Sequence, residues 1–500
     1  MQGTKIGLLV GGVLLAVIGG SNVQAETLQP DPAWLQGKLD NGFTWQLLTT
    51  PQRPGDRVEL RLMVNTGSLV ENAQQIGFAH FLPRLALTPG DDFSAAQLPS
   101  LWQQQDNATR SLPPAVTSYD FTFYNLSLPN NRPELMKEAL NWLSETAGQL
   151  AISDQHIHAA LNLPDPVAQF PINPQDPAWR YRLKGSALLA HDPGQAVKPP
   201  LNPEQLEQFY KTWYTPDAMT LYVVGHVDQR GIVDQIGKAF SSLQGKRAAP
   251  APVPTLSPLP PHAISLINNN VQQDTLSLVW DTPWHPIRDS ETLARYWRSD
   301  LAREALFWHV QQALQKSQQK DNNLRFDCNV LYTRAQCAIH MDVPGIDSVM
   351  PGMTFMAQTL AALRDNGLTQ QEFDALITRK TDELGKLFAT YARTGTDVLM
   401  EQRLRSQQNG VVDIAPEQYQ KLRQHYLSSL TLDTLNQALH QQLSQEATLM
   451  LIQQQGEPEV NMKELQTAYS RIMTPDAAAA PAAAEEEPKP QEEAAAPAAQ

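Results

Sequence analysis

Several common enzyme signatures are missing from the 500 residues of this chain. It contains no G-x-S-x-G nucleophile elbow, no G-x-x-x-x-G-K-[ST] phosphate loop and no C-x-x-C pair. These motifs mark serine hydrolases, P-loop nucleotide-binding proteins and dithiol redox or zinc sites. Their absence counts against the commonest rival classes of enzyme, although a missing motif is weaker evidence than one that is present.

Positive charge is also scarce. The chain has 38 lysines and arginines against 52 aspartates and glutamates, so its formal net charge is −14. A surface that binds nucleic acid needs clustered basic side chains to face the phosphates. We therefore expect no nucleic-acid partner.

Long hydrophobic runs are limited to the N-terminus. Lys5 precedes an apolar run over residues 6–20, and the small-residue pattern Val23-Gln24-Ala25 follows it. This pattern predicts a secretory signal peptide over residues 1–25 that is removed after export. The alternative is an uncleaved anchor, but the run is shorter than the roughly 20 residues that a membrane span needs. We expect no integral membrane segment in the mature chain.

Cysteine occurs only twice, as Cys328 and Cys337. The two residues flank a predicted hairpin centred on Tyr332 and Thr333, so they face each other across its strands. Directly opposed Cβ atoms lie about 4.5 to 5.5 Å apart. A disulfide is compatible with this placement in an oxidising compartment. Two reduced cysteines in a strand pair are the alternative, and the pair alone lacks two ligands for zinc.

The chain divides at a proline-rich stretch, residues 247–261, which predicts an extended linker. It separates an N-terminal lobe, residues 26–246, from a C-terminal lobe, residues 262–473. Residues 474–500 are almost entirely Ala, Pro and Glu, and such a tail cannot bury enough apolar surface to become ordered.

The two lobes repeat a similar order of elements, which predicts an α+β fold. In the first we expect strands over residues 37–48, 58–65, 118–128 and 220–226, with helices at His80, over residues 133–150 and from Pro203. In the second we expect strands over residues 263–267, 275–280 and 447–452 around the cysteine hairpin. Its helices are predicted over residues 291–315 and from Ser348, Thr369, Pro416 and Thr431.

One segment carries a specific resemblance. Residues 67–90 read GSLVENAQQIGFAHFLPRLALTPG. They resemble the G-S-x-x-E-x-x-x-x-G-x-A-H-F-L-E-H signature of the insulinase/pitrilysin zinc metallopeptidases, the H-x-x-E-H inverzincins. The matching residues are Gly67, Ser68, Glu71, Gly77, Ala79, His80, Phe81 and Leu82, with one residue more between Glu71 and Gly77 than the signature has.

Two later segments extend the resemblance over nearly the whole mature chain. Residues 117–124 resemble the T-S-x-D-x-T-x-Y strand of that family. Residues 209–228 resemble its F-Y-x-x-W-Y-x-P-x-x-M-x-L-x-V-V-G-x-V-D segment. The resemblance implies two structurally similar lobes of the pitrilysin type that enclose a cavity, and a periplasmic location for the exported chain.

The metal-binding positions depart from the family pattern. His80 is the only retained ligand, because Pro83 and Arg84 stand where the general-base Glu and the second His belong. The resemblance places the third ligand, a glutamate, within residues 152–169, where the expected positions hold Leu161 and Leu163 and the nearest acid is Asp165. We therefore predict no catalytic residue and no bound metal. We also expect substitution of Pro83 and Arg84 by Glu and His alone not to restore the site.

A peptide-binding strand is the feature that the resemblance retains. Relatives hold an extended substrate against an exposed strand edge, and Ala115, Thr117 and Ser118 match that strand. An ordinary core strand is the alternative. The sequence thus predicts a non-catalytic protein that binds peptides or pairs with an active homologous peptidase. The alternative is an active zinc-dependent metalloendopeptidase with a displaced ligand set, and zinc is implied as a cofactor only in that case.

Overall fold

The computed structural model describes residues 27–53, 55–89, 112–171, 173 and 175–474. The predicted signal peptide, residues 1–25, lies outside the described residues. So does the predicted disordered tail, apart from residue 474.

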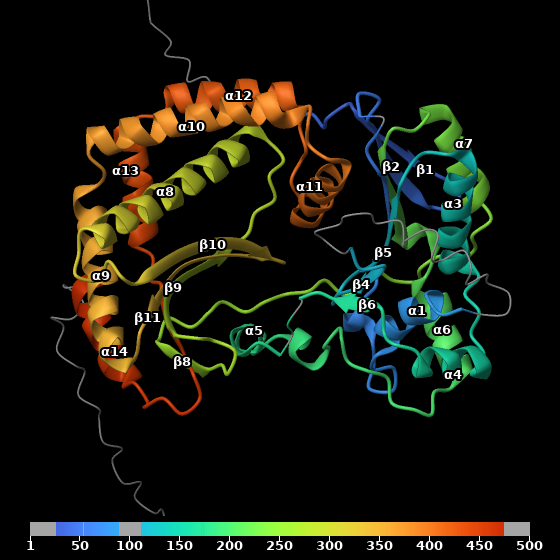
Figure 1. The fold of residues 1–500 in the computed structure, drawn as a ribbon, viewed down its shortest axis with the longest axis horizontal. Helices are drawn as coiled ribbons and strands as arrows, with labels where there is room; N and C mark the ends of the chain where they lie inside the picture. Colours follow the sequence, from blue (N-terminus) through green and yellow to red (C-terminus); the bar gives the residue numbers. More distant parts are fainter. Residues whose placement is uncertain (1–26, 54, 90–111, 172, 174, 475–500) are drawn as a thin grey trace, which may run out of the picture.

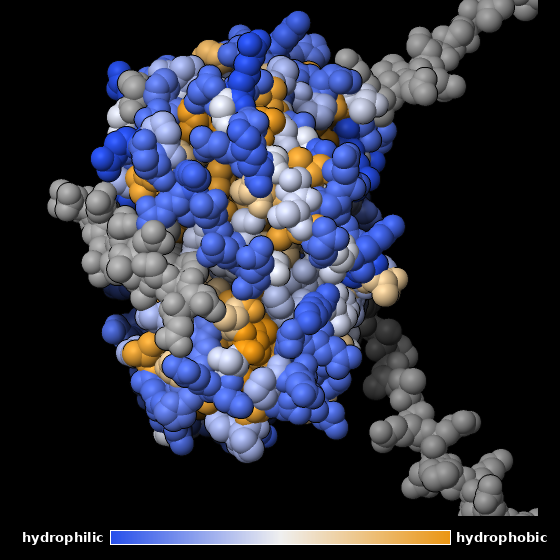
Figure 2. All heavy atoms as spheres, turned by 90° about the vertical axis from the view of Figure 1, so that its right-hand side faces the viewer, coloured by the Kyte–Doolittle hydropathy of each residue, from blue (hydrophilic) through white to orange (hydrophobic). Residues whose placement is uncertain are grey.

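The N-terminal lobe, which we call lobe 1, is built on a seven-stranded sheet with the order β1-β2-β7-β3-β5-β4-β6. Its strands are β1 (Trp34–Lys38), β2 (Thr44–Thr49), β3 (Val58–Val64), β4 (Ala115–Thr117), β5 (Thr122–Leu128), β6 (Val167–Gln169) and β7 (Met219–Gly225). Its helices are α1 (Phe78–Ala86), α3 (Pro133–Gly148), α4 (Asp154–Asn162), α5 (Pro177–Arg182), α6 (Pro203–Trp213) and α7 (Gln229–Phe240). Figure 2 looks onto the outer side of this lobe, which is mostly hydrophilic with hydrophobic patches between polar side chains.

The C-terminal lobe, which we call lobe 2, is built on a five-stranded sheet with the order β10-β11-β9-β12-β8. Its strands are β8 (Ile264–Ile267), β9 (Asp274–Pro283), β10 (Asn323–Leu331), β11 (Arg334–Val343) and β12 (Thr448–Gln453). The helices of this half are α8 (Ser290–Gln315), α9 (Val349–Asn366), α10 (Gln370–Tyr391), α11 (Thr396–Asn409), α12 (Pro416–Ser429), α13 (Leu432–Leu443) and α14 (Met462–Met473). Capping boxes at Asp289 and Thr369 fix the starts of α8 and α10.

The two sheets have the same strand topology over five strands. Lobe 1 contains the run β2-β7-β3-β5-β4, and lobe 2 contains the matching run β8-β12-β9-β11-β10. In both runs the first pair is parallel and every later pair is antiparallel. The predicted α+β class with two related lobes is therefore confirmed. In this correspondence α8, which follows β9, occupies the place of α1, which follows β3.

One predicted strand is wrong. Residues 37–48 form the two strands β1 and β2, which pair as a hairpin, because Asp40-Asn41-Gly42 makes a tight turn between them. Gly42 has a φ of +95°, and an added Cβ would lie 2.8 Å from the Cβ of Asp217. The expected hairpin at Tyr332 and Thr333 does form, with Leu331 opposite Arg334.

Lobe 1 buries both faces of its sheet. On one face Leu47, Leu221 and Val223 join the hydrophobic core with residues of α1, α3, α6 and α7. The other face packs against α11, a helix of the second half of the chain, which lies between the lobes in Figure 1. Leu48, Tyr222, Val224, Leu399 and Met400 form the apolar part of this contact. A helix from the second half of the chain thus buries one face of the lobe 1 sheet.

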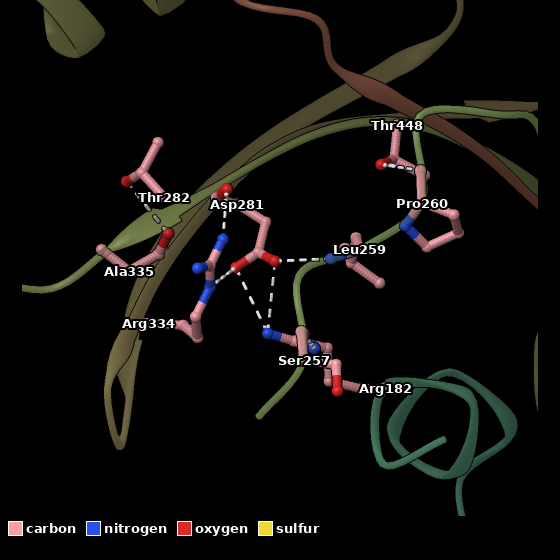
Figure 3. A network of polar contacts seen from close by, with 9 residues as sticks. All are labelled: Arg182, Ser257, Leu259, Pro260, Asp281, Thr282, Arg334, Ala335 and Thr448. Atoms are coloured by element: carbon pink, nitrogen blue, oxygen red, sulfur yellow. Dashed lines mark hydrogen bonds and ion pairs between the residues drawn. The ribbon is translucent and has the colours of Figure 1, made fainter. Parts of the chain in front are cut away.

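A buried polar network also joins the lobes (Figure 3). Asp281 of β9 binds Arg182 of α5, whose Nη2 lies 3.3 Å from both carboxylate oxygens, and Arg334 of β11, whose Nε lies 3.1 Å from Oδ1. The linker joins in through Leu259, whose backbone N–H donates to the same carboxylate over 2.7 Å. The side chains of Asp281 and Arg182 are only 4% and 5% exposed, so one carboxylate fixes both lobes and the linker.

Candidate functional site

The His80 helix begins at a carboxylate cap. Glu71 accepts hydrogen bonds from the backbone N–H groups of Gly77 (3.0 Å) and Ala79 (2.7 Å). These are among the donors that an α-helix leaves unpaired at its start. Burial raises the pKa of Glu71 to about 7 against the opposing effect of these two hydrogen bonds. The glutamate of the sequence signature is therefore a structural group that positions α1.

Gly77 is required where α1 begins. Its φ is +86°, and an added Cβ would lie 2.7 Å from the carbonyl oxygen of Gln195. Three residues later His80 is placed on the buried side of the helix, where it is 9% exposed. Pro83 lies inside the helix and is buried. It has no N–H to donate back along the helix, and its ring offers no group for acid-base chemistry.

His80 and Arg84 converge on one carboxylate. Nε2 of His80 lies 2.9 Å from Oδ2 of Asp165, and Nη1 of Arg84 lies 3.7 Å from the same oxygen. Nη2 of Arg84 also donates to the carbonyl oxygens of Leu163 (2.7 Å) and Leu161 (3.4 Å). The guanidinium thus ties α1 to the end of α4, and we refer to His80, Arg84 and Asp165 as the His-Arg-Asp cluster.

The cluster keeps Asp165 ionised. Burial alone would raise its pKa, but the hydrogen bonds from His80 and the Val167 N–H, together with the charge of Arg84, hold that pKa below its usual value. The Val167 bond, 2.9 Å from Asp165 Oδ1, links the cluster to the first residue of β6. The resemblance led to a window, residues 152–169, that contains Asp165, but it did not show this contact across 85 positions.

The residues of the cluster do not fit zinc. A catalytic zinc site needs three protein ligands and an open position, and here only His80 and Asp165 supply donor atoms. Arginine cannot lose its proton to become a ligand, and its charge repels a cation. Within the described ranges, no group of three or more His, Cys, Asp or Glu side chains is placed to hold a metal ion.

The predicted peptide strand is paired on both sides. β4 pairs antiparallel with β5 and parallel with β6, and the Phe170 N–H donates to the carbonyl oxygen of Thr117 over 2.9 Å. Ala115, Thr117 and Ser118 are fully buried. A peptide can therefore add to β4 only where β6 has been displaced, and peptide binding at these three residues stays a prediction.

The turn between β10 and β11 reaches this region from lobe 2. The ring of Tyr332 packs edge-on against Tyr119 with the ring centroids 6.3 Å apart. Burial raises the pKa of the neighbouring Asp120 to about 6, and none of the described residues gives its Oδ1 a hydrogen bond. The sequence predicted this hairpin but gave no sign that its tip contacts lobe 1. In the structure, a disulfide joins Cys328 and Cys337 across the hairpin.

Family models match two parts of the chain. Residues 47–174 match the model described as insulinase (peptidase family M16), and residues 200–380 match the peptidase M16 inactive domain. The chain belongs to the M16 family. A curated M16 relative, Protein YhjJ of Escherichia coli K12, is 58% identical over 479 residues and 96% of each chain. The probable zinc protease PqqL of Haemophilus influenzae is 22% identical over 89% of this chain but only 49% of its own length.

Solved M16 structures agree with the fold. A predicted insulinase family protease from Yersinia pestis has a TM-score of 0.87 at 66% identity, covering 93% of this chain and 100% of that one. The first half of the periplasmic protease PqqL from Escherichia coli has a TM-score of 0.74 at 20% identity, covering 91% and 99%. Across the described part of the chain, we find no helix with both the length and the apolar character of a membrane span.

Proposed function

We propose that this M16 chain is a non-catalytic periplasmic protein that binds peptides or pairs with an active peptidase homologue. The observation that carries the proposal is the His-Arg-Asp cluster, in which a guanidinium stands beside the one retained histidine. A unit positive charge about 4 Å from a divalent cation costs about 8 kcal/mol at an effective dielectric near 20. Pro83 supplies no carboxylate for general-base catalysis, which commonly contributes about 10²- to 10⁴-fold in rate.

Export to the periplasm is supported by three features. The N-terminal sequence has the pattern of a signal peptide, and PqqL, which shares the fold, is titled a periplasmic protease. A disulfide between Cys328 and Cys337 suits an oxidising compartment.

The competing function is an active zinc metalloendopeptidase with a displaced ligand set. It is favoured by Asp165, because this carboxylate lies 2.9 Å from His80 although it falls outside the expected ligand positions. Two ligands still leave the set one short. Metal content and hydrolysis therefore distinguish the two functions.

We expect the purified mature protein to hold less than about 0.1 equivalent of zinc and to leave an unfolded peptide uncut, because the cluster offers only two ligands. Elemental analysis and a fluorogenic-peptide assay measure the two quantities, with His80→Ala as the matched variant. Near-stoichiometric zinc, lost together with hydrolysis in His80→Ala, would establish the peptidase instead.

Peptide binding at β4 has its own test. Asp165→Asn removes the charge that holds Arg84 and weakens the acceptor of the Val167 N–H, so β6 should leave β4 more often. Because affinity scales with the fraction of binding-competent molecules, we expect a fluorescent unfolded peptide to bind about three- to tenfold more tightly, as measured by anisotropy. Asp234→Asn, at an exposed pair on α7, is the control. Faster amide exchange of β6 without tighter peptide binding would place the peptide site elsewhere.

A further inference from the structure

A hollow of ≈ 370 Å³ opens in lobe 2, whereas the His-Arg-Asp cluster lies in lobe 1, on the other side of Figure 1. It lies between α8, α13 and the ends of β9 and β11. Its lining includes Trp280 of β9, the α8 residues Arg295, Arg298, Ser299 and Arg303, and Gln442 of α13. None of its lining residues, all of them in the described part of the chain, carries a carboxylate. We refer to it as the arginine hollow.

The charge of the side chains that line the hollow is opposite in sign to the net charge of the chain. Three arginines line this one hollow in a chain whose formal net charge is −14. Arg295 has an acidic partner, Glu291, but both side chains are more than half exposed, and such pairs contribute little. The side chain of Arg303 is 17% exposed, and its Nη2 lies 3.8 Å from Oδ1 of Asp300. Asp300 lines a second hollow beside this one. The arginine hollow therefore keeps an excess of positive charge.

Two buried N–H groups of residues that line the hollow have no acceptor within the described part of the chain. Trp280 is 4% exposed, and its indole N–H is one of these groups. The Nε of Arg303 is the other. Buried N–H groups in folded proteins are nearly always satisfied by protein, water or ligand. Both groups belong to residues that line the hollow, so they mark it as a place where an acceptor is missing.

We propose that the arginine hollow binds a small oxyanion, a phosphate or carboxylate group carried on a free molecule. The planar fork of arginine matches the oxygens of either group, and charge-assisted hydrogen bonds are the stronger kind. Ser299 and Gln442 add neutral polar groups beside the arginines. The site is independent of any activity at the His-Arg-Asp cluster.

The test uses the mature protein with inorganic phosphate or succinate as probes and chloride at equal ionic strength as reference. We expect at least one probe to raise Tm saturably and to bind by calorimetry, whereas chloride does neither. Arg295→Gln/Arg298→Gln changes two exposed residues and should weaken that binding at least about tenfold, since hydrogen bonds to charged groups are worth about 1.5 to 3 kcal/mol. Phosphate binding alone points to a phosphorylated ligand, and succinate binding alone to a carboxylate.

Arg230→Gln/Arg405→Gln is the matched control, because it removes the same charge from exposed sites on α7 and α11. It should bind the probe as the unmodified protein does. Equal weakening in both double variants would show that net charge attracts the anion. That result, or the absence of saturable binding to either probe, would overturn the proposal.

Discussion

Asp281→Ala should lower the free energy of unfolding by about 3 to 5 kcal/mol, the usual result of leaving buried charges without their partner. The substitution leaves two guanidinium groups without their acidic partner, because Arg182 and Arg334 both bind this carboxylate. Their side chains are only 5% and 12% exposed. It also removes the acceptor for the Leu259 N–H. Burial already lowers the pKa of Arg182, and the charge of Asp281 acts against that shift.

Urea unfolding followed by tryptophan fluorescence measures this loss. Asp234→Ala is the control, since its pair with Lys238 is 61% and 76% exposed and its loss should change stability by less than about 1 kcal/mol. If Asp281→Ala unfolds at the same urea concentration as Asp234→Ala, the network does not stabilise the lobe interface.

Local patterns predicted the elements well. The turn at Tyr332 was readable because neighbouring residues determine it. The facing of Cys328 and Cys337 followed from the same turn. The strand predicted over residues 118–128 forms only over Thr122–Leu128, where every residue is buried. The single strand predicted over residues 37–48 is wrong because Asp40-Asn41-Gly42 is a turn sequence that divides it into β1 and β2.

Contacts between distant segments were not predictable in this way. β6 is three residues long and stands between Pro166 and Pro171, a pattern that reads as a loop. Its pairing with β4 depends on where α4 ends, which spacing does not fix. The packing of α11 on lobe 1 is likewise set by the tertiary fold, since its apolar residues Leu399 and Met400 suit any hydrophobic partner.

The structure changes one expectation about the metal site. From sequence, Pro83→Glu/Arg84→His should fail because leucines occupy the third-ligand positions. In the fold, however, Asp165 already lies 2.9 Å from His80 Nε2. Two ligands of one tetrahedral zinc stand roughly 3.3 Å apart, given bonds near 2.0 to 2.1 Å. The distance between His80 Nε2 and Asp165 Oδ2 is therefore only a few tenths of an ångström shorter than the distance between two zinc ligands.

We now expect Pro83→Glu/Arg84→His to bind about one equivalent of zinc with micromolar or tighter affinity, which corresponds to a binding free energy of about −8 kcal/mol or better. A histidine at position 84 lies one turn from His80 on the same face of α1. The double variant loses the charge of Arg84 but keeps the Val167 N–H bond that lowers the pKa of Asp165, and metal binding requires the deprotonated carboxylate. Zinc titration with a competing chelator measures the affinity, and adding Asp165→Asn to the double variant is the control. If that control binds zinc as tightly as the double variant, Asp165 is not the third ligand. If neither binds zinc, the fold around α1 has lost the shape of a metal site, and restoring ligand atoms alone cannot rebuild it.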